Sequence, residues 1–396
     1  MSSLSEVCKL IVDCPHSTAR NEGEGYPLIR TPNIGKGRFN LENVHRVSEE
    51  IYNIRNTRAV PQDDDLILAR EAPAGNVAII KNGDKFCLGQ RTVLIRPDKG
   101  KVNPDFLVYY LLSPEQQNKL LSQANGSTVD HVNLPIIRNL QLSLPPLPVQ
   151  QRIASILSAY DDIIENNQKQ IKLLEEAAQR LYKEWFVDLR FPGHESVKIV
   201  DGVPEGWNKV RLDAVTSVLK RGISPKYDEN GEFTVINQKC IRKNIVDYSE
   251  SRKQSKKYAE ELQLQESDTV ICSTGIGTLG RVGQIYNVYQ NSTFDSHVTL
   301  VRANKLIGKQ FLFWSLKLLQ PYLMSLGKGS TNQQELYKSD LTACFLLLPE
   351  EYIMNAFERQ AQELHDIIAV KTKQISSLRE ARDRLLPKLM SGEIEV

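Results

Sequence analysis

The chain has 396 residues, 41% of them hydrophobic and 25% charged, with a formal net charge of +2. This length predicts two domains with cores of their own, and the composition excludes a disordered chain. No run reaches the roughly 18 apolar residues of a membrane span, residues 1–10 lack a secretory signal, and six scattered cysteines form no C-x-x-C pair. We therefore expect a cytoplasmic protein with free thiols and no bound metal.

Residues 1–147 form the first expected globule. Residues 26–34 are a β-branched run beside polar turns, and residues 77–97 read as a hairpin around the turn Asn82-Gly83. A helical pattern follows at residues 104–123. Strands followed by a helix predict an α+β domain.

Residues 148–191 carry an apolar seam whose positions step alternately by four and three. The seam consists of Ile153, Leu157, Tyr160, Ile164, Asn167, Ile171, Leu174, Ala178, Leu181 and Trp185. This spacing is typical of a long helix that packs on another helix.

Residues 192–348 form a second globule that repeats the first with a period near 203. The triplet Gly-Ser-Thr at residues 126–128 returns at residues 329–331, and the apolar stretch at 64–80 returns at 267–285. The second globule is more basic, with 20 Lys and Arg against 15 Asp and Glu over residues 196–348, compared with 17 against 16 over residues 1–147.

Residues 349–396 carry a second seam. It consists of Phe357, Ala361, Leu364, Ile368, Lys371, Ile375, Leu378, Arg382, Leu385 and Leu389. A shift of 204 superimposes the two seams and places Asn167 on Lys371. A polar residue interrupts each apolar seam at the equivalent position. This favours two helices that pack on each other, with Asn167 and Lys371 close together. In the alternative, each helix lies only on its own globule.

The sequence thus predicts two tandem mixed α/β domains, separated by two long antiparallel coiled-coil helices and related by a pseudo-two-fold repeat. The expected parts are residues 1–147, 148–191, 192–348 and 349–396. Two similar globules held apart by a spacer suit a long, repeating partner such as duplex DNA.

Motifs for catalysis are missing from the sequence. The string GIGTLG at residues 275–280 resembles a dinucleotide fingerprint, but the following RVGQIYNVY reads as a strand, whereas a phosphate cradle needs a helix start there. Pro145-Pro146 lacks the flanking residues of an amino-methyltransferase site. Glu115 is followed by Gln117 in place of the lysine of a nuclease motif, and no P-loop occurs. His297, in Asp-Ser-His, reads as part of a turn.

Three segments resemble the specificity subunit of type I restriction-modification systems. They are LPPLPVQQRIASILSAYDDIIENNQKQIKLLEEAAQRLYKEWF at 144–186, VPEGWNKVRLDAV at 203–215 and REARDRLLPKLMSGEIEV at 379–396. The resemblance covers essentially the whole chain. The second helix departs from the pattern, because LLLPEEYIMNAFERQA lacks both Pro-Pro-x-Pro and Gln-Gln-Arg.

The resemblance implies that each globule is a target recognition domain that reads half of a split DNA sequence. The helices would set the unread gap and dock two methylation subunits, and restriction subunits would join that core. S-adenosylmethionine, ATP and magnesium are expected on those partners, so this chain would be a non-catalytic subunit without a cofactor. Two alternatives stay open: a self-contained DNA-modifying enzyme with diverged motifs, and a protein scaffold that does not bind DNA.

Bases are read by Arg and short polar side chains, and phosphates are contacted by Lys and Arg. In the first globule the candidates are Arg30, Thr31, Asn33, Lys36, Arg38, Arg70, Ser127 and Thr128. In the second they are Lys220, Arg221, Asn237, Gln238, Lys239, Ser273, Thr274, Ser330, Thr331, Asn332 and Gln333. The basic run at residues 251–257 is expected to face phosphates or solvent. No catalytic residue is predicted.

Overall fold

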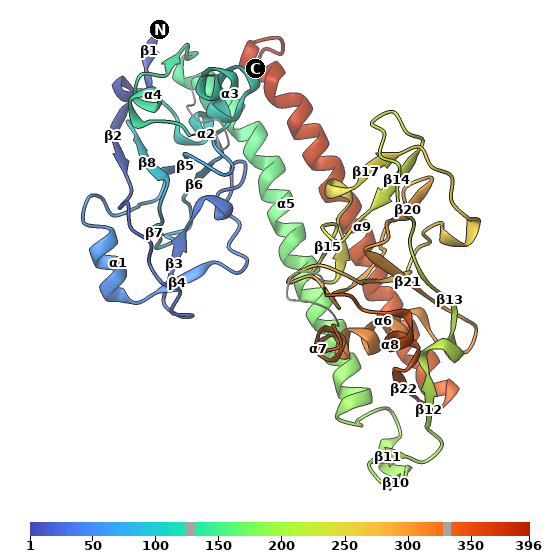
Figure 1. The fold of residues 1–396 in the computed structure, drawn as a ribbon. Helices are drawn as coiled ribbons and strands as arrows, with labels where there is room; N and C mark the ends of the chain where they lie inside the picture. The colour runs from blue at the N-terminus through green and yellow to red at the C-terminus, as the bar shows by residue number, and fades with distance from the viewer. Residues whose placement is uncertain (123–130, 328–333) are drawn as a thin grey trace. The chain divides into compact units, whose positions relative to one another are not determined.

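The computed structural model describes residues 1–122, 131–327 and 334–396. They divide into two compact units, unit 1 with residues 1–166 and 376–396, and unit 2 with residues 167–375. Each unit contains one globule and a stretch of two long helices, α5 (Leu147–Tyr182) and α9 (Glu351–Ser391), coloured green and red in Figure 1. Within the described ranges, no helix is long and apolar enough to cross a membrane.

Unit 1 contains two main sheets. The larger has the order β2 (Cys8–Asp13), β8 (Thr92–Pro97), β5 (Leu66–Ala69) and β6 (Val77–Ile79), all antiparallel. The smaller has the order β4 (His45–Val47), β3 (Tyr26–Ile29) and β7 (Cys87–Leu88), with β3 and β7 parallel. A short pair joins β1 (Ser2–Ser3) to β9 (Gln141–Leu142).

The helices of the first globule are α1 (Glu49–Arg55), α2 (Pro104–Leu112), α3 (Pro114–Leu121) and α4 (Leu134–Arg138). The single helical pattern expected over residues 104–123 is split at Ser113. This residue is extended, caps α3 with its side chain and precedes Pro114 at the first helical position. The apolar side of α2 packs on β6.

Unit 2 repeats this arrangement and extends it. Its larger sheet has the order β13 (Thr216–Arg221), β21 (Val298–Ala303), β18 (Thr269–Cys272), β19 (Val282–Gln284), β16 (Ile245–Val246) and β15 (Ile241–Arg242). Its smaller sheet has the order β17 (Arg252–Gln254), β14 (Phe233–Ile236) and β20 (Ser292–Phe294).

The remaining elements of unit 2 complete its globule. Strand β10 (Ile199–Val200) pairs with β11 (Val203–Pro204), and β12 (Asn208–Arg211) pairs with β22 (Phe345–Leu348). Its helices are α6 (Lys309–Leu318), α7 (Gln320–Ser325) and α8 (Lys338–Thr342). Helix α6 packs on β19 as α2 packs on β6.

In each unit, the central strand of the larger sheet carries apolar side chains on both faces, because both faces are covered. On β5, Leu66 and Leu68 enter the core under α2, whereas Ile67 enters a second core beside the smaller sheet. On β18, Ile271 and Val270 divide in the same way. Side chains of a strand alternate between faces, so an uninterrupted apolar run fits a strand covered on both sides. The α+β expectation is confirmed.

A bidentate ion pair confirms the internal repeat at the level of single side chains. Arg96 binds both carboxylate oxygens of Asp65 at 2.8 and 2.7 Å, and Arg302 binds Asp268 at the same two distances. In both units the aspartate immediately precedes the central strand and also accepts from a backbone N–H three residues earlier.

The glycines of GIGTLG lie in a turn between two antiparallel strands, β18 and β19. Gly280 donates its N–H to the carbonyl of Cys272, as Gly75 donates to that of Ala69, and both glycines have positive φ. A strand follows where a phosphate cradle would need a helix, as the sequence predicted.

The prediction of a hairpin over residues 77–97 is wrong. Asn82 and Gly83 do form a turn, with φ of 64° and 71°. After it, however, the chain leaves the larger sheet, and β7 pairs in parallel with β3 in the smaller one. The strand that β6 pairs with is β5.

The two long helices pack on each other in antiparallel fashion within each unit. In unit 1, Leu157 shares a core with Leu389. In unit 2, Ala178 shares a core with Phe357, and the amide of Asn167 donates to Gln374 Oε1 at 3.3 Å. The seam therefore pairs the helices, and the contact of Asn167 is with Gln374, which lies within one helical turn of Lys371 on α9.

Each helix also lies on a globule, through a buried polar residue at equivalent positions. In unit 1, Asp161 of α5 accepts from the Tyr109 hydroxyl at 2.7 Å and from Arg382 Nη1 at 2.5 Å. In unit 2, His365 of α9 stacks on Tyr286, with 4.5 Å between ring centroids. The prediction that the helices pack on each other is therefore confirmed, and the alternative in which each helix lies only on its own globule is wrong, because each helix buries one face on its partner helix and another on a globule.

Candidate nucleic-acid interface

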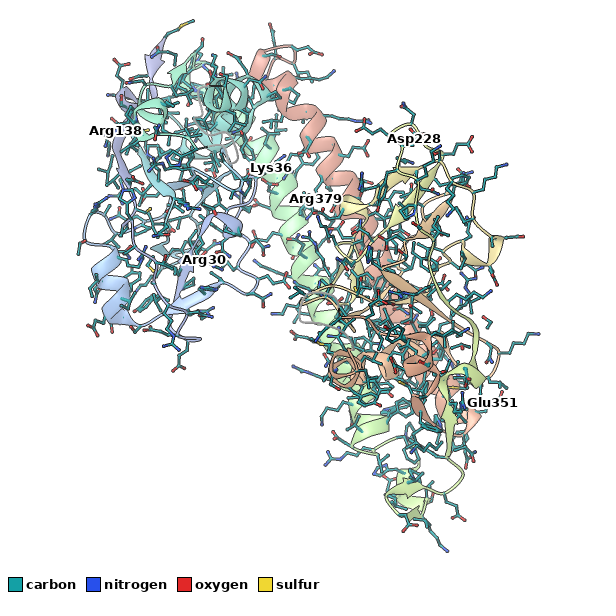
Figure 2. The ribbon with its side chains drawn as sticks, in the orientation of Figure 1. Arg30, Lys36, Arg138, Asp228, Glu351 and Arg379 are labelled. Atoms are coloured by element: carbon teal, nitrogen blue, oxygen red, sulfur yellow. The ribbon has the colours of Figure 1, made fainter. Side chains whose placement is uncertain are left out.

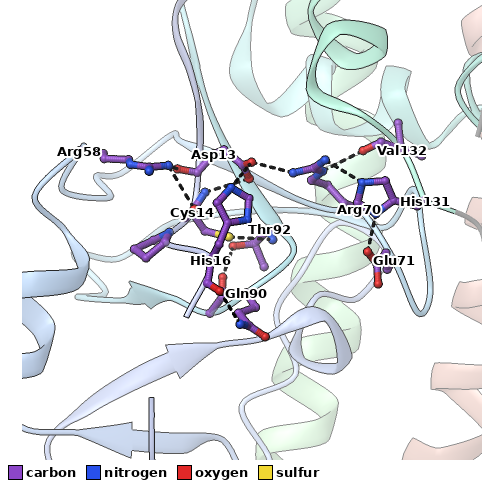
Figure 3. A network of polar contacts seen from close by, with 12 residues as sticks. Asp13, Cys14, His16, Arg58, Arg70, Glu71, Gln90, Thr92, His131 and Val132 are labelled. Atoms are coloured by element: carbon purple, nitrogen blue, oxygen red, sulfur yellow. Dashed lines mark hydrogen bonds and ion pairs between the residues drawn. The ribbon is translucent and has the colours of Figure 1, made fainter. Parts of the chain in front are cut away.

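Arg70 follows β5 and lies at the centre of a polar network (Figure 3). Its Nε donates to the carbonyl of Val132 at 2.8 Å, and its terminal nitrogens lie 2.7 Å from Asp13 Oδ2 and 2.8 Å from His131 Nε2. The side chain is buried. These contacts occupy the guanidinium inside the protein, so they support a structural role in place of the expected reading of bases.

Glu71, the next residue, joins this network to the surface. One carboxylate oxygen contacts His131 Nδ1, and the other lies 2.9 Å from Nε of Arg91. The Arg91 side chain is 58% exposed. The strand end thus holds two carboxylates, two guanidinium groups and the imidazole of His131, and among them the side chain of Arg91 is the most exposed.

The corresponding strand end in unit 2 carries neutral side chains. Ser273 is fully buried and its hydroxyl contacts Thr299 Oγ1 at 2.5 Å. The Thr274 hydroxyl lies 2.6 Å from His297 Nδ1 and 3.3 Å from Gln238 Oε1. The structure therefore brings the candidates Thr274 and Gln238 together, around a histidine that is exposed.

Arg221 approaches the same strand end from β13. Its Nη1 lies 3.2 Å from Glu335 Oε2, and Glu335 forms an isolated β-bridge with Thr274. The backbone N–H of His297 donates to Asp295 Oδ1 at 2.9 Å. The Asp-Ser-His segment is the expected turn, and it also presents a ring nitrogen to Thr274.

Two other candidates form ion pairs with acidic side chains and lie apart from these clusters. Arg38 pairs with Asp162 on α5 at 2.8 Å, and Lys220 pairs with Glu261 at 2.5 Å. These contacts join Arg38 to helix α5 and Lys220 to the 3-10 turn Glu260–Leu262. Arg38 is only 24% exposed, which favours a structural role, whereas Lys220 is 48% exposed and its ion pair contributes little to stability.

The candidates in short turns divide into buried and exposed residues. Thr31 and Asn33 are buried in a 3-10 turn, where the Asn33 amide donates to the carbonyl of Asn40. The Asn237 amide donates to the carbonyl of Glu250. Of the candidates in turns, Lys36 and Lys239 are exposed.

Arg30, labelled with Lys36 in Figure 2, is half-buried, and its Nε has no hydrogen-bond partner within the described residues. A buried N–H without a partner is costly, so a ligand oxygen would be a favourable neighbour for it. Six candidates lie outside the described residues: Ser127, Thr128, Ser330, Thr331, Asn332 and Gln333.

The basic run at residues 251–257 is partly held by the protein. The guanidinium of Arg252 lies over the ring of Tyr227, 3.5 Å from its centroid, and Lys256 donates to the carbonyl of Ser224. Lys257 is exposed. Exposed positive charge of this kind suits phosphates better than base edges.

The thiols do not form a reactive centre. All six cysteines are free, and burial raises the pKa of Cys240 to about 11 and that of Cys272 to about 12, which keeps both protonated. Glu266, His365 and Asp366 place three potential metal ligands within 4.8 Å of one another. Because the His365 ring already packs on Tyr286 and the two carboxylates are exposed, this group does not resemble a closed metal site.

Residues 1–176 and 204–374 match the family described as "Type I restriction modification DNA specificity domain". The chain belongs to this family. The two matched stretches correspond to the two copies of the repeat, so the specificity-domain pattern occurs twice.

Relatives from this family cover most of the chain. The type I restriction enzyme MjaIX specificity subunit of Methanocaldococcus jannaschii is 28% identical over 84% of this chain and 78% of its own length. The MjaVIII specificity subunit of the same organism is 25% identical over 95% and 88%. The crystal structure of the type I restriction-modification S subunit from M. genitalium has the same fold, with a TM-score of 0.59, 16% identity and coverage of 98% and 95%.

Sequence reasoning missed Glu71, Arg91, His131 and Glu335, and it assigned His297 only to a turn. The residues that meet at each strand end come from segments far apart in the chain, such as residues 13, 70 and 131 in unit 1. The one available signal was the repeat itself, because aligning residues 64–80 with 267–285 pairs Arg70 and Glu71 with Ser273 and Thr274.

Proposed function

We propose that this chain is a sequence-specific DNA-binding subunit of a type I restriction-modification complex, in which each globule reads one half of a split duplex target. The observation that carries the proposal is the duplicated framework with different side chains at the same strand ends. One such end holds Glu71, Arg91 and His131, and the other holds Thr274, His297 and Glu335. Equal frameworks with unequal hydrogen-bonding groups suit two half-sites of different sequence.

The helices would set the gap between the half-sites and dock two methylation subunits. Exposed apolar side chains support the docking, because α5 presents Ile163 and Leu173, and α9 presents Ile367 and Val370, each at least 44% exposed. Apolar groups on a helix face away from the core are typical of surfaces that bind another protein. Restriction subunits would join this core.

The chemistry would belong to the partners. S-adenosylmethionine, ATP and magnesium are proposed to bind there, and this chain would contribute recognition alone, in the cytoplasm. The alternatives are a self-contained DNA-modifying enzyme and a scaffold that does not touch DNA. The missing acceptor before Pro145-Pro146 disfavours the first, and the guanidinium groups of Arg91 and Arg221 near the two strand ends disfavour the second.

The experiment is to express the intact system in a host that lacks its modification and to map methylated adenines in the genome. A split motif with an unread gap of constant length supports the proposal, and its absence rejects it. Purified chain incubated alone with S-adenosylmethionine and genomic DNA should transfer no methyl group. Methyl transfer in this control would support the self-contained enzyme instead.

A further inference from the structure

Arg91 and His297 occupy the same position in the two copies of the repeat. The carbonyl of Arg91 accepts the backbone N–H of Arg70 at 2.8 Å, and the carbonyl of His297 accepts that of Ser273 at 2.8 Å. Each precedes the strand that runs antiparallel to the central strand, β8 in unit 1 and β21 in unit 2.

The residues that hold these two side chains are also equivalent. Arg91 pairs with Glu71 at 2.9 Å, and His297 contacts the Thr274 hydroxyl at 2.6 Å. Glu71 follows Arg70 as Thr274 follows Ser273. The repeat therefore preserves a pair of contacting positions while changing both side chains.

Both side chains reach solvent, although each is held by a neighbour. Arg91 is 58% exposed and His297 is also exposed. Arg91 further has φ of 65°, a conformation that is uncommon for residues other than glycine and that tends to occur at functional sites. An oriented, exposed polar side chain is what reading a base edge requires.

We propose that Arg91 and His297 are specificity-determining residues, each reading a base in the half-site bound by its own globule. The inference rests on the proposed function, since it presumes that both globules bind DNA. The ion pair of Arg91 engages Nε, and its terminal nitrogens match O6 and N7 of guanine. When the Thr274 hydroxyl donates to Gln238, it accepts from Nδ1–H of His297, whose Nε2 then accepts from the amino group of adenine or cytosine.

The test uses the intact system with single substitutions in the full chain, and it reads base preference from methylated sites. In Arg91→Ala we expect about a tenfold loss of preference at one base pair, a guanine position of one half-site, with the other half-site unchanged. His297→Ala should relax one position in the other half-site only. Matched controls are Lys85→Ala and Gln290→Ala, exposed residues of the same globules, which should leave the motif unchanged.

Retained preference at the untouched half-site shows that each variant folds. If a variant abolishes methylation, the purified full chain is tested for competition by duplexes with one base pair changed at a time. The proposal is overturned if the preferences at every position equal those of the wild type in both variants, or if one substitution relaxes both half-sites equally. If the wild-type system yields no split motif, the proposed function itself fails.

Discussion

The guanidinium of Arg382, near the end of α9, donates to the buried carboxylate of Asp161 on α5, with 2.5 Å between Nη1 and Oδ1. The same carboxylate accepts from Tyr109 of α2, whose pKa burial raises, so that its hydroxyl stays protonated as a donor. One carboxylate thus connects both helices to the globule of unit 1.

Replacing Arg382 by Ala should lower the free energy of unfolding of unit 1 by about 3 kcal/mol, because a buried charge loses its partner. Hydrogen exchange of α2 and α5 amides measures this, since tryptophan fluorescence reports only on Trp185, Trp207 and Trp314 in unit 2. Arg379→Ala, an exposed arginine on the same helix, is the control and should change protection by less than about 0.5 kcal/mol. Equal effects of the two variants would contradict the prediction.

We expect the main effect of Arg70→Ala to be a lower free energy of unfolding of unit 1, not a change in base preference. The substitution removes three contacts and leaves the carbonyl of Val132 without this donor, which is expected to cost about 1 to 3 kcal/mol. Hydrogen exchange of β5 and β8 checks the loss, with the exposed Arg20→Ala as control. A variant of wild-type stability with altered base preference would restore Arg70 as a reading residue.

Cysteines introduced at 167 and 374 should crosslink more readily than cysteines at 167 and 371. The reason is the direct contact between the Asn167 and Gln374 side chains. Oxidation followed by peptide mapping measures the yields, and a pair at 167 and the exposed position 373 is the control. The expected order reverses if Lys371 is the true partner.

The second globule should supply more of the salt-dependent affinity for DNA, because its excess of basic residues is larger. In the full chain, Lys239→Ala with Lys257→Ala should reduce the slope of log affinity against log salt by up to roughly 2. Lys9→Ala with Lys85→Ala, which removes two exposed charges from the first globule, should reduce it less. Equal slopes for the two double variants would refute this.

The pKa of Lys317 is lowered to about 8, chiefly by burial, while Glu175 opposes the shift and Arg281 adds to it. Between pH 8 and the ordinary lysine value near 10.5, the folded protein binds fewer protons than the unfolded one, so the contribution of Lys317 to stability rises with pH. Lys317→Met should therefore stabilise unit 2 at pH 7 and lose that advantage by pH 10. Denaturation followed by tryptophan fluorescence measures the difference, and the exposed Lys338→Met should show no such change with pH.

Much of the architecture was already determined by local pattern. The alternation of four and three along the seam predicted both long helices, because buried helix faces impose that period on apolar residues. Repetition of Gly-Ser-Thr and of the apolar run at 64–80 predicted two similar α+β globules. The strand after GIGTLG likewise excluded a phosphate cradle.

Only the tertiary structure decided which side chains meet. From the sequence, Arg70 was expected to be free to contact DNA. In the structure, Asp13 and His131, about sixty residues away on either side, occupy its donors. Residues 77–97 read as one hairpin, yet β6 and β7 enter different sheets. Local patterns record the burial of a face, whereas hydrogen-bond partners and strand neighbours depend on chain segments that approach only after folding. For that reason the helices and the repeat were predictable, and the contacts of Arg91 and His297 were not.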